Sequence, residues 1–134
     1  MKKLLASAII ILSFVFTACQ SSEAIDNKAI KVVMKFNEKC PMMIDAETQM
    51  DGIEIKNGNT IVYKYRLINL FAARVDTAQF NRALRPGIIN TIKTNAELNE
   101  LKRIKSSFEY YYRDRDGKFI YSFVITPEDY NDQE

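Results

Sequence analysis

The chain has 134 residues, of which 19 are Lys or Arg and 17 are Asp or Glu, and it contains no histidine. This length suits one domain, and the near balance of charge argues against a nucleic acid held by overall positive charge. Without histidine, the chain lacks the side chain that titrates near neutral pH and the usual base of a serine or cysteine nucleophile. We therefore expect no catalytic residue and no cofactor.

The first residues have the pattern of an export signal. Lys2 and Lys3 precede an apolar run over residues 4–18, which ends in the small residues Thr17 and Ala18 before Cys19. A basic start, a short apolar stretch and a small-residue cleavage site are typical of a secretory signal peptide. The run is shorter than the roughly 18 apolar residues that a membrane-spanning helix needs, so we interpret it as a signal and not as a membrane span.

The segment Phe16-Thr17-Ala18-Cys19 resembles the lipobox of bacterial lipoproteins, with Phe16 in the position where leucine is usual. The resemblance implies that residues 1–18 are removed, that Cys19 is the site of lipid attachment, and that residues 19–24 form a short tether to a membrane. It also implies a place in the cell envelope. Gln20 after the cysteine resembles the pattern that directs lipoproteins to the periplasmic face of the outer membrane in a cell with two membranes.

Removal of the signal would change the charge and the thiol count. Lys2 and Lys3 are the only basic residues before Cys19, so 19 minus 2 leaves 17 basic residues against 17 acidic ones. With Cys19 lipidated, Cys40 is the only thiol, and no intramolecular disulfide can form. We expect Cys40 to be buried as a small apolar side chain. A reactive thiol or an intermolecular disulfide is the alternative.

An amphipathic helix is predicted over residues 24–39. One side is apolar and comprises Ile25, Ala29, Val32, Val33, Phe36 and Cys40. The opposite side is basic and comprises Lys28, Lys31, Lys35 and Lys39. The apolar side has the spacing of a helix that faces a core. The lysines are either an ordinary solvated surface or a basic stripe that faces anionic lipid headgroups near the anchor.

Two hairpins are predicted, with helical segments between them. The first joins residues 52–56 and 60–69 through a three-residue loop with a bulge, because this register alone puts Ile53, Ile55 and Tyr63 on one face. The second joins residues 108–115 and 118–125 through a two-residue turn at Asp116-Gly117. In the second hairpin the expected cross-strand pairs are Tyr112 with Tyr121, Tyr110 with Phe123, and Phe108 with Ile125.

Between the hairpins, Asp76 or Thr77 can cap a helix that continues to about residue 84. Pro86-Gly87 is expected to interrupt it. A second helical piece is expected to start at Thr94 or Asn95, where Thr94 and Glu97 have capping-box spacing.

These elements predict an α+β fold of two layers, with helices packed on a four-stranded antiparallel sheet made of the two hairpins. A constant offset of 45 residues between the two halves suggests a duplicated helix–hairpin unit. We expect one domain over residues 25–127, followed by an acidic tail over residues 128–134 that frays.

Few side chains in the sequence suggest catalysis or metal binding. The carboxylates of Asp45, Glu47, Asp51 and Glu54 cluster in and after one loop, which is typical of a polar connection more often than of a glycosidase-like acid pair. A soft cluster of sulfur atoms comprises Cys40, Met42 and Met43, with Met34 and Met50 nearby, and sulfur ligands favour Cu(I). The absence of histidine counts against a metal site.

Tyr111 is expected on the outer face of the second hairpin, near Arg113. A tyrosine beside an arginine is the composition of a protein-binding hot spot, although it is also common on any outer face. We expect a non-catalytic envelope accessory protein that binds another protein, as an assembly factor, an inhibitor or an immunity-type protein. The alternative is a carrier of a small ligand or of copper.

Overall fold

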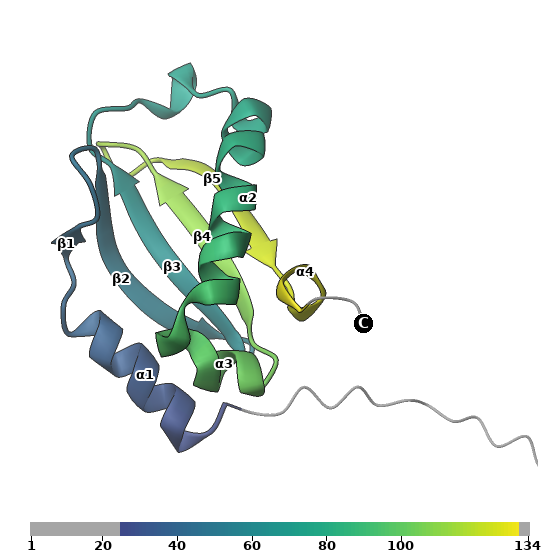
Figure 1. Ribbon diagram of the computed structural model, residues 1–134. Helices are drawn as coiled ribbons and strands as arrows, with labels where there is room; N and C mark the ends of the chain where they lie inside the picture. Colours follow the sequence, from purple (N-terminus) through teal and green to yellow (C-terminus); the bar gives the residue numbers. More distant parts are fainter. Residues whose placement is uncertain (1–24, 132–134) are drawn as a thin grey trace, which may run out of the picture.

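A sheet forms one layer of the protein and helices form the other (Figure 1). The computed structural model describes residues 25–131, so the predicted signal peptide and Cys19 lie outside the described residues. The elements, in chain order, are α1 (Asn27–Asn37), β1 (Met42–Met43), β2 (Thr48–Lys56), β3 (Thr60–Leu67), η1 (Ala72–Arg74), α2 (Thr77–Thr94), η2 (Ala96–Leu98), α3 (Asn99–Arg103), β4 (Ser107–Arg113), β5 (Phe119–Ile125) and α4 (Pro127–Tyr130). This arrangement confirms the α+β class with helices packed on a sheet.

The sheet differs from the prediction in strand number and in direction. It has five strands in the order β1-β2-β3-β4-β5, and β3 pairs with β4 in parallel. The expected four-stranded antiparallel sheet is therefore wrong. The 18 residues of α2 span about 27 Å and return the chain to the end of the sheet where β3 starts. A strand that begins there and lies beside β3 must run parallel to it.

Both predicted hairpin registers are confirmed. In the first, Ile53 pairs with Tyr63 and Ile55 with Ile61 across a three-residue loop, and Gly58 has a φ of 76°. The irregularity in this hairpin lies between Met50 and Gly52, away from the loop. In the second, Tyr112 pairs with Tyr121, Tyr110 with Phe123, and Phe108 with Ile125.

The turn of the second hairpin is longer than the predicted two-residue turn. A register shift beside Tyr112 pairs Arg113 with Phe119 and leaves residues 114–118 in the loop. Asp114 organises this loop, because its Oδ1 accepts hydrogen bonds from the backbone N–H groups of Asp116 and Lys118, both at 2.9 Å. The local side-chain bonds replace the simple turn that Asp116-Gly117 suggested.

Helix α1 has the orientation that its pattern predicts, within shorter bounds. Asp26 caps it, with Oδ1 accepting a hydrogen bond of 2.9 Å from the N–H of Ala29. Ala29 and Val33 are buried, and the other residues of the apolar side pack against the core. All four lysines of the opposite side are exposed.

Helix α2 passes through Pro86 and Gly87, so the predicted interruption is wrong. Pro86 has no N–H to donate to the carbonyl of Arg82, which removes one helical hydrogen bond. Apolar residues on both sides of Pro86, among them Leu84 and Ile88, pack against the core and keep the helix in register. Of the two residues predicted as the cap, Asp76 is the one that the structure shows, with Oδ1 3.0 Å from the N–H of Gln79.

The predicted second helical piece is a short 3-10 turn followed by α3. Asn95 caps it by accepting a hydrogen bond of 2.9 Å from the N–H of Glu97. The Thr94 hydroxyl instead donates to the carbonyl of Asn90 at 2.9 Å, inside α2. The capping role therefore belongs to Asn95, and the capping box expected from Thr94 does not form.

The start of the expected acidic tail belongs to the fold. Residues 127–130 form α4, which a capping box between Thr126 and Asp129 begins. Tyr130 is buried, packs edge-on against Phe108 and donates a hydrogen bond of 2.8 Å to the carbonyl of Ser106. A buried aromatic ring with a satisfied hydroxyl fixes this segment to the core, so the tail does not begin at residue 128.

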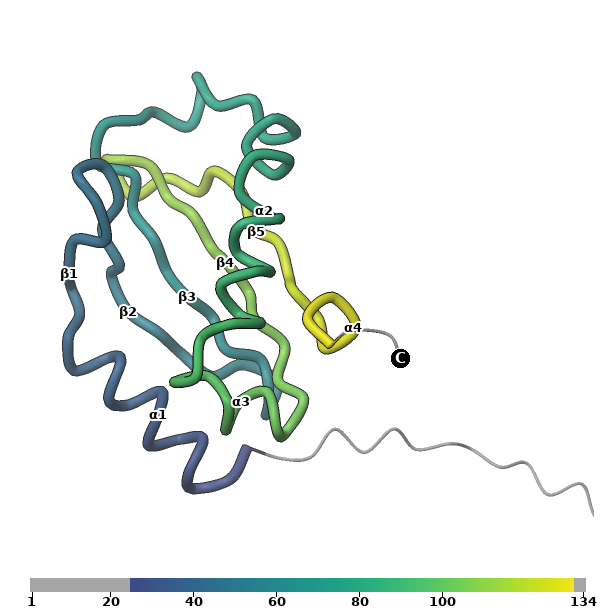
Figure 2. Tube along the Cα trace, in the orientation of Figure 1, coloured from purple at the N-terminus to yellow at the C-terminus, as the bar shows by residue number. Residues whose placement is uncertain are grey.

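Different elements lie at the two ends of the domain. Figure 2 shows α1 and α3 near one end of the sheet, and the loop before α2 at the opposite end. Within residues 25–131, no helix combines the length and the apolar character needed to cross a membrane.

Candidate protein-binding groove

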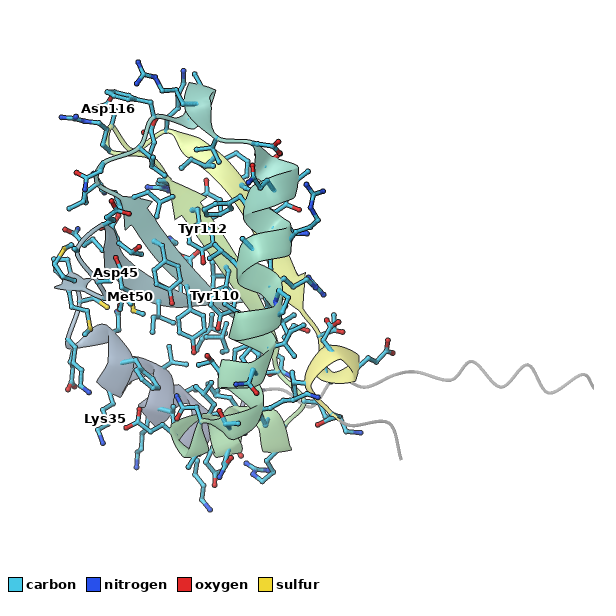
Figure 3. The ribbon with its side chains drawn as sticks, turned by 45° about the horizontal axis from the view of Figure 1, so that its top comes forward. Lys35, Asp45, Met50, Tyr110, Tyr112 and Asp116 are labelled. Carbon is cyan, nitrogen blue, oxygen red and sulfur yellow. The ribbon has the colours of Figure 1, made fainter. Side chains whose placement is uncertain are left out.

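An open groove lies between α2 and the helix-covered face of the sheet. It has a volume of about 350 Å³. The lining residues are Ile44, Asp45, Glu47, Thr48, Tyr65, Leu67, Leu70, Phe80, Leu84, Ile88, Tyr110 and Tyr112. Figure 3 shows Tyr110 and Tyr112 beside α2, with Asp45 and Met50 on the side of the groove farther from α2.

Stacked tyrosines form the floor of the groove. The parallel register of β3 and β4 places Tyr63 opposite Tyr110 and Tyr65 opposite Tyr112. The ring centroids of these pairs are 5.2 and 5.3 Å apart. On α2, Phe80 packs edge-on against Tyr112 with centroids 4.9 Å apart. Aromatic pairs of this geometry stabilise a rigid surface.

The hydroxyl groups of the floor are neutral. Burial raises the pKa of Tyr65, Tyr110 and Tyr112 above the usual value for tyrosine. These hydroxyls therefore remain protonated at neutral pH and can donate and accept hydrogen bonds. A broad apolar surface with a few neutral hydroxyls can bury the apolar groups of a bound molecule and still form hydrogen bonds with its polar groups.

The far wall of the groove is the loop before β2, and it is acidic at its rim. Oδ1 of Asp45 accepts hydrogen bonds of 2.8 Å from the N–H groups of Glu47 and Thr48. The bonds to these backbone groups hold the pKa of Asp45 below its usual value, so this carboxylate is charged at neutral pH. Its bonding to the loop backbone gives Asp45 a structural role.

The carboxylates that cluster in the sequence do not converge on one point. Asp51 lies 3.0 Å from Arg66, and Glu54 forms an ion pair with Lys64. Asp45 is bonded to its own loop. Asp45, Asp51 and Glu54 therefore each have a separate partner, which does not favour a facing acid pair of the glycosidase kind.

The outer face of the sheet carries Tyr111 and Arg113, on the side opposite the groove. The Arg113 guanidinium lies 5.3 Å from the centre of the Tyr111 ring, and Phe119 lies 5.1 Å from it. A shallow depression of about 240 Å³ lies here among charged side chains, two of which, Lys56 and Glu109, are 3.2 Å apart. The structure does not bring Tyr111 and Arg113 to the groove, and their role in partner binding stays a prediction.

The sulfur side chains of the predicted soft cluster differ in exposure, although Met42 of β1 pairs with Met50 of β2 and only Met50 of the two is buried. The thiol of Cys40 donates to the carbonyl of Phe36 at 3.6 Å, and burial raises its pKa, which disfavours the thiolate that binds metal. Met50 is buried, whereas Met34 is 58% exposed. In the part of the chain that the structure describes, no group of three acidic or cysteine side chains could hold a metal ion. The raised pKa of Cys40 counts against a thiolate ligand for copper, and copper binding by the methionines stays an untested alternative.

The residues of α2 that line the groove were not identified by the sequence reasoning. Phe80, Leu84 and Ile88 are four residues apart, which places them on one face of a continuous helix. If Pro86 ended the helix, Ile88 would not lie on the same helix face as Phe80 and Leu84, and the apolar row of the three would not be recognised. The signal in the sequence was the spacing of four residues between Phe80, Leu84 and Ile88.

The fold is an α+β layer of helices on a mixed five-stranded sheet, with an open groove between α2 and the sheet. The chain belongs to the family described as "Domain of unknown function (DUF8479)", which matches residues 24–121. Among curated proteins, none matches the chain.

Solved structures share the fold at low sequence identity. A protein of Pseudomonas aeruginosa described as secreted aligns with a TM-score of 0.64 and 13% identity, over 76% of this chain and 88% of that chain. The pilotin EpsS of the Vibrio vulnificus type 2 secretion system aligns with a TM-score of 0.57 and 10% identity, over 78% and 92%. The type II secretion pilotin AspS of Vibrio cholerae aligns with a TM-score of 0.54 and 12% identity, over 74% and 85%.

Proposed function

We propose that this protein is a lipid-anchored accessory protein of the cell envelope, which binds a partner protein during assembly of an envelope complex and catalyses no reaction. The observation that carries the proposal is the open apolar groove beside α2 on a fold shared with two secretion-system pilotins. Pilotins are proteins of an envelope machine, and the fold likeness supports a similar class of role. The groove supplies a surface for a protein segment.

The proposed anchor is a lipid on Cys19, on the basis of the lipobox-like residues 16–19. It places the domain on a membrane surface outside the cytoplasm, at the periplasmic face of the outer membrane in a cell with two membranes. Mass analysis of the mature N-terminus tests this part, because diacylglycerol on the sulfur of Cys19 adds a defined mass. An unmodified cysteine would remove the anchor from the proposal.

The groove is proposed to hold an apolar segment of the partner. Its walls present Leu70, Leu84 and Ile88 above the tyrosine floor, and burying such side chains against a partner releases about 25 cal/mol per Å² of apolar surface. The neutral tyrosine hydroxyls give the bound segment hydrogen-bond partners without a charge to desolvate. The partner is therefore expected to contribute apolar side chains and some unpaired backbone or hydroxyl groups.

Site-specific photo-crosslinking in living cells tests the groove. A photoreactive amino acid at position 70, in the groove, should give one discrete adduct with a partner protein. The matched control is position 124, because Leu70 is 41% and Val124 40% exposed and Val124 lies on β5, outside the groove. Equal adducts from both positions, or none from position 70, would contradict the proposal.

A further inference from the structure

Some basic side chains of the domain form ion pairs with carboxylates, and others do not. On the outer face of the sheet, Lys56, Lys64 and Arg66 each form an ion pair with a carboxylate. The four lysines of the basic side of α1 are exposed, and none forms an ion pair within residues 25–131. These four, Lys28, Lys31, Lys35 and Lys39, are called the basic face below. Their charge has to be balanced by something outside the domain.

Acidic groups near the basic face are few or already paired. Over residues 27–39, Glu38 is the single acidic residue beside the four lysines. Arg103 of α3 forms ion pairs with both Asp26 and Glu100. Glu97 remains at the border of the basic face. The face therefore keeps an excess of positive charge, which favours an anionic surface as its complement.

A small cleft lies at the border between the basic face and the apolar side of α1. It has a volume of about 140 Å³ and is lined by Val32 and Phe36, together with Lys35, Lys39 and Glu97. Two apolar side chains beside two ammonium groups match the chemistry at the surface of an anionic bilayer, where phosphate groups lie next to glycerol and the first methylene groups. The long side chains of lysine can bury their stems there while their charges meet the phosphates.

The described part of the chain begins beside α1, the helix that carries the basic face. The backbone N–H of Ile25 donates to the carbonyl of Gly58 at 3.2 Å, which fixes the start of α1 at the end of the first hairpin. Cys19 precedes Ile25 by six residues, a segment that reaches at most about 20 Å. A lipid on Cys19 would therefore keep the basic face within reach of headgroups.

We propose that the basic face docks on the anionic phospholipid headgroups of the membrane that holds the anchor, and so fixes the orientation of the domain. The proposal rests on the lipid anchor of the proposed function. Each lysine near such a surface adds attraction, which acts within about a Debye length. In this orientation α1 and α3 face the bilayer, and the loop before β2 lies toward the other end of the sheet (Figure 2).

The test uses the mature protein, purified from membranes and reconstituted in vesicles of phosphatidylcholine, with or without phosphatidylglycerol as a minority component. Hydrogen exchange of the α1 amides should slow several-fold when phosphatidylglycerol is present, and high salt should remove the difference. Exchange in the loop of residues 115–118, at the other end, should not change. Equal exchange of α1 in the two kinds of vesicle at low salt would overturn the proposal.

Two variants with the same loss of charge separate the basic face from net charge. Changing Lys28, Lys31, Lys35 and Lys39 to Gln should abolish the phosphatidylglycerol effect on α1. Changing Lys56, Lys64, Arg82 and Lys118 to Gln also removes four positive charges and should leave it intact. An equal loss in both variants would show that no specific face docks.

Failure of the anchor gives a distinct result in the same experiment. Without a lipid on Cys19, the protein would not remain with vesicles of phosphatidylcholine alone. Failure of the docking proposal would leave the protein on both kinds of vesicle, with α1 exchanging equally fast on each.

Discussion

A single buried carboxylate connects two loops at one end of the domain. Asp114 is 3% exposed. Its Oδ2 accepts a hydrogen bond of 2.9 Å from the N–H of Ala72 in η1, while Oδ1 accepts from Asp116 and Lys118 in the loop between β4 and β5. These backbone bonds, the one from Ala72 foremost, hold the pKa of Asp114 below its usual value. The charged form is therefore the one that the fold stabilises.

Changing Asp114 to Asn should lower the stability of the domain at neutral pH. A group whose folded-state pKa lies below its unfolded value of 3.8 contributes stability that is present above that value and is lost as the pH falls through the folded pKa. The urea midpoint of the variant should thus be lower than that of the native protein at pH 7, and the difference should shrink below about pH 4.

The neighbouring residue provides the control for this prediction. Asp116 is exposed and its nearest ionic contact, Arg115, is 3.9 Å away, so Asp116→Asn should change the midpoint little. A midpoint for Asp114→Asn that equals that of Asp116→Asn at pH 7 would show that the carboxylate does not join the two loops.

At the scale of the element, α2 decides whether the groove exists. Its groove-facing residues lie on both sides of Pro86, and they line one wall only because the helix is continuous. Pro86 and Gly87 are both exposed, so neither is required for packing. The helix continues because its apolar residues gain more from contact with the core than the missing hydrogen bond costs.

Replacement of Gly87 by Ala should stabilise the protein by about 0.5–1 kcal/mol, because alanine has the higher helix propensity and its Cβ would meet no atom within 4 Å. Pro86→Ala should stabilise it by about 1–3 kcal/mol by restoring the helical hydrogen bond. Urea unfolding measures both. A loss of stability in Gly87→Ala would mean that the helix is interrupted at this point after all.

At the scale of the whole molecule, two surfaces with different chemistry lie apart from one another. The groove lies between α2 and the loop before β2, with an apolar and tyrosine-lined floor and an acidic rim. The basic face lies on the outer side of α1. A domain held by one surface on a membrane can present the other to a partner, which suits an accessory protein that brings a partner to an envelope site.

Changes in the two surfaces should therefore have independent effects. Ile44, which is 48% exposed on the far wall of the groove, can be changed to Gln with little effect on the fold. Ile44→Gln should weaken the adduct formed from position 70 and leave the lipid-dependent exchange of α1 unchanged. The four lysine-to-Gln changes of the basic face should have the reverse pattern. If either variant lost both the adduct from position 70 and the lipid-dependent exchange of α1, the two surfaces would not be independent.

The sequence by itself determined the features that depend on neighbouring residues. The alternation of apolar residues decided both hairpin registers, because a slip by one residue would expose the core face, whereas the turn residues of the second hairpin predicted too short a loop. The apolar side of α1 and the cap at Asp76 followed from helical spacing and from the short side chain that accepts backbone N–H groups.

The tertiary structure alone decided the parallel pairing of β3 with β4, the two-residue strand β1, the unbroken α2 and the packing of Tyr130. Each of these depends on contacts between residues far apart in the chain, and such contacts overcome the local preference of Pro86 to end a helix or of an acidic tail to fray. The groove belongs to this second group. It exists because α2, β3 and β4, which are separate segments of the chain, lie beside one another without filling the space between them.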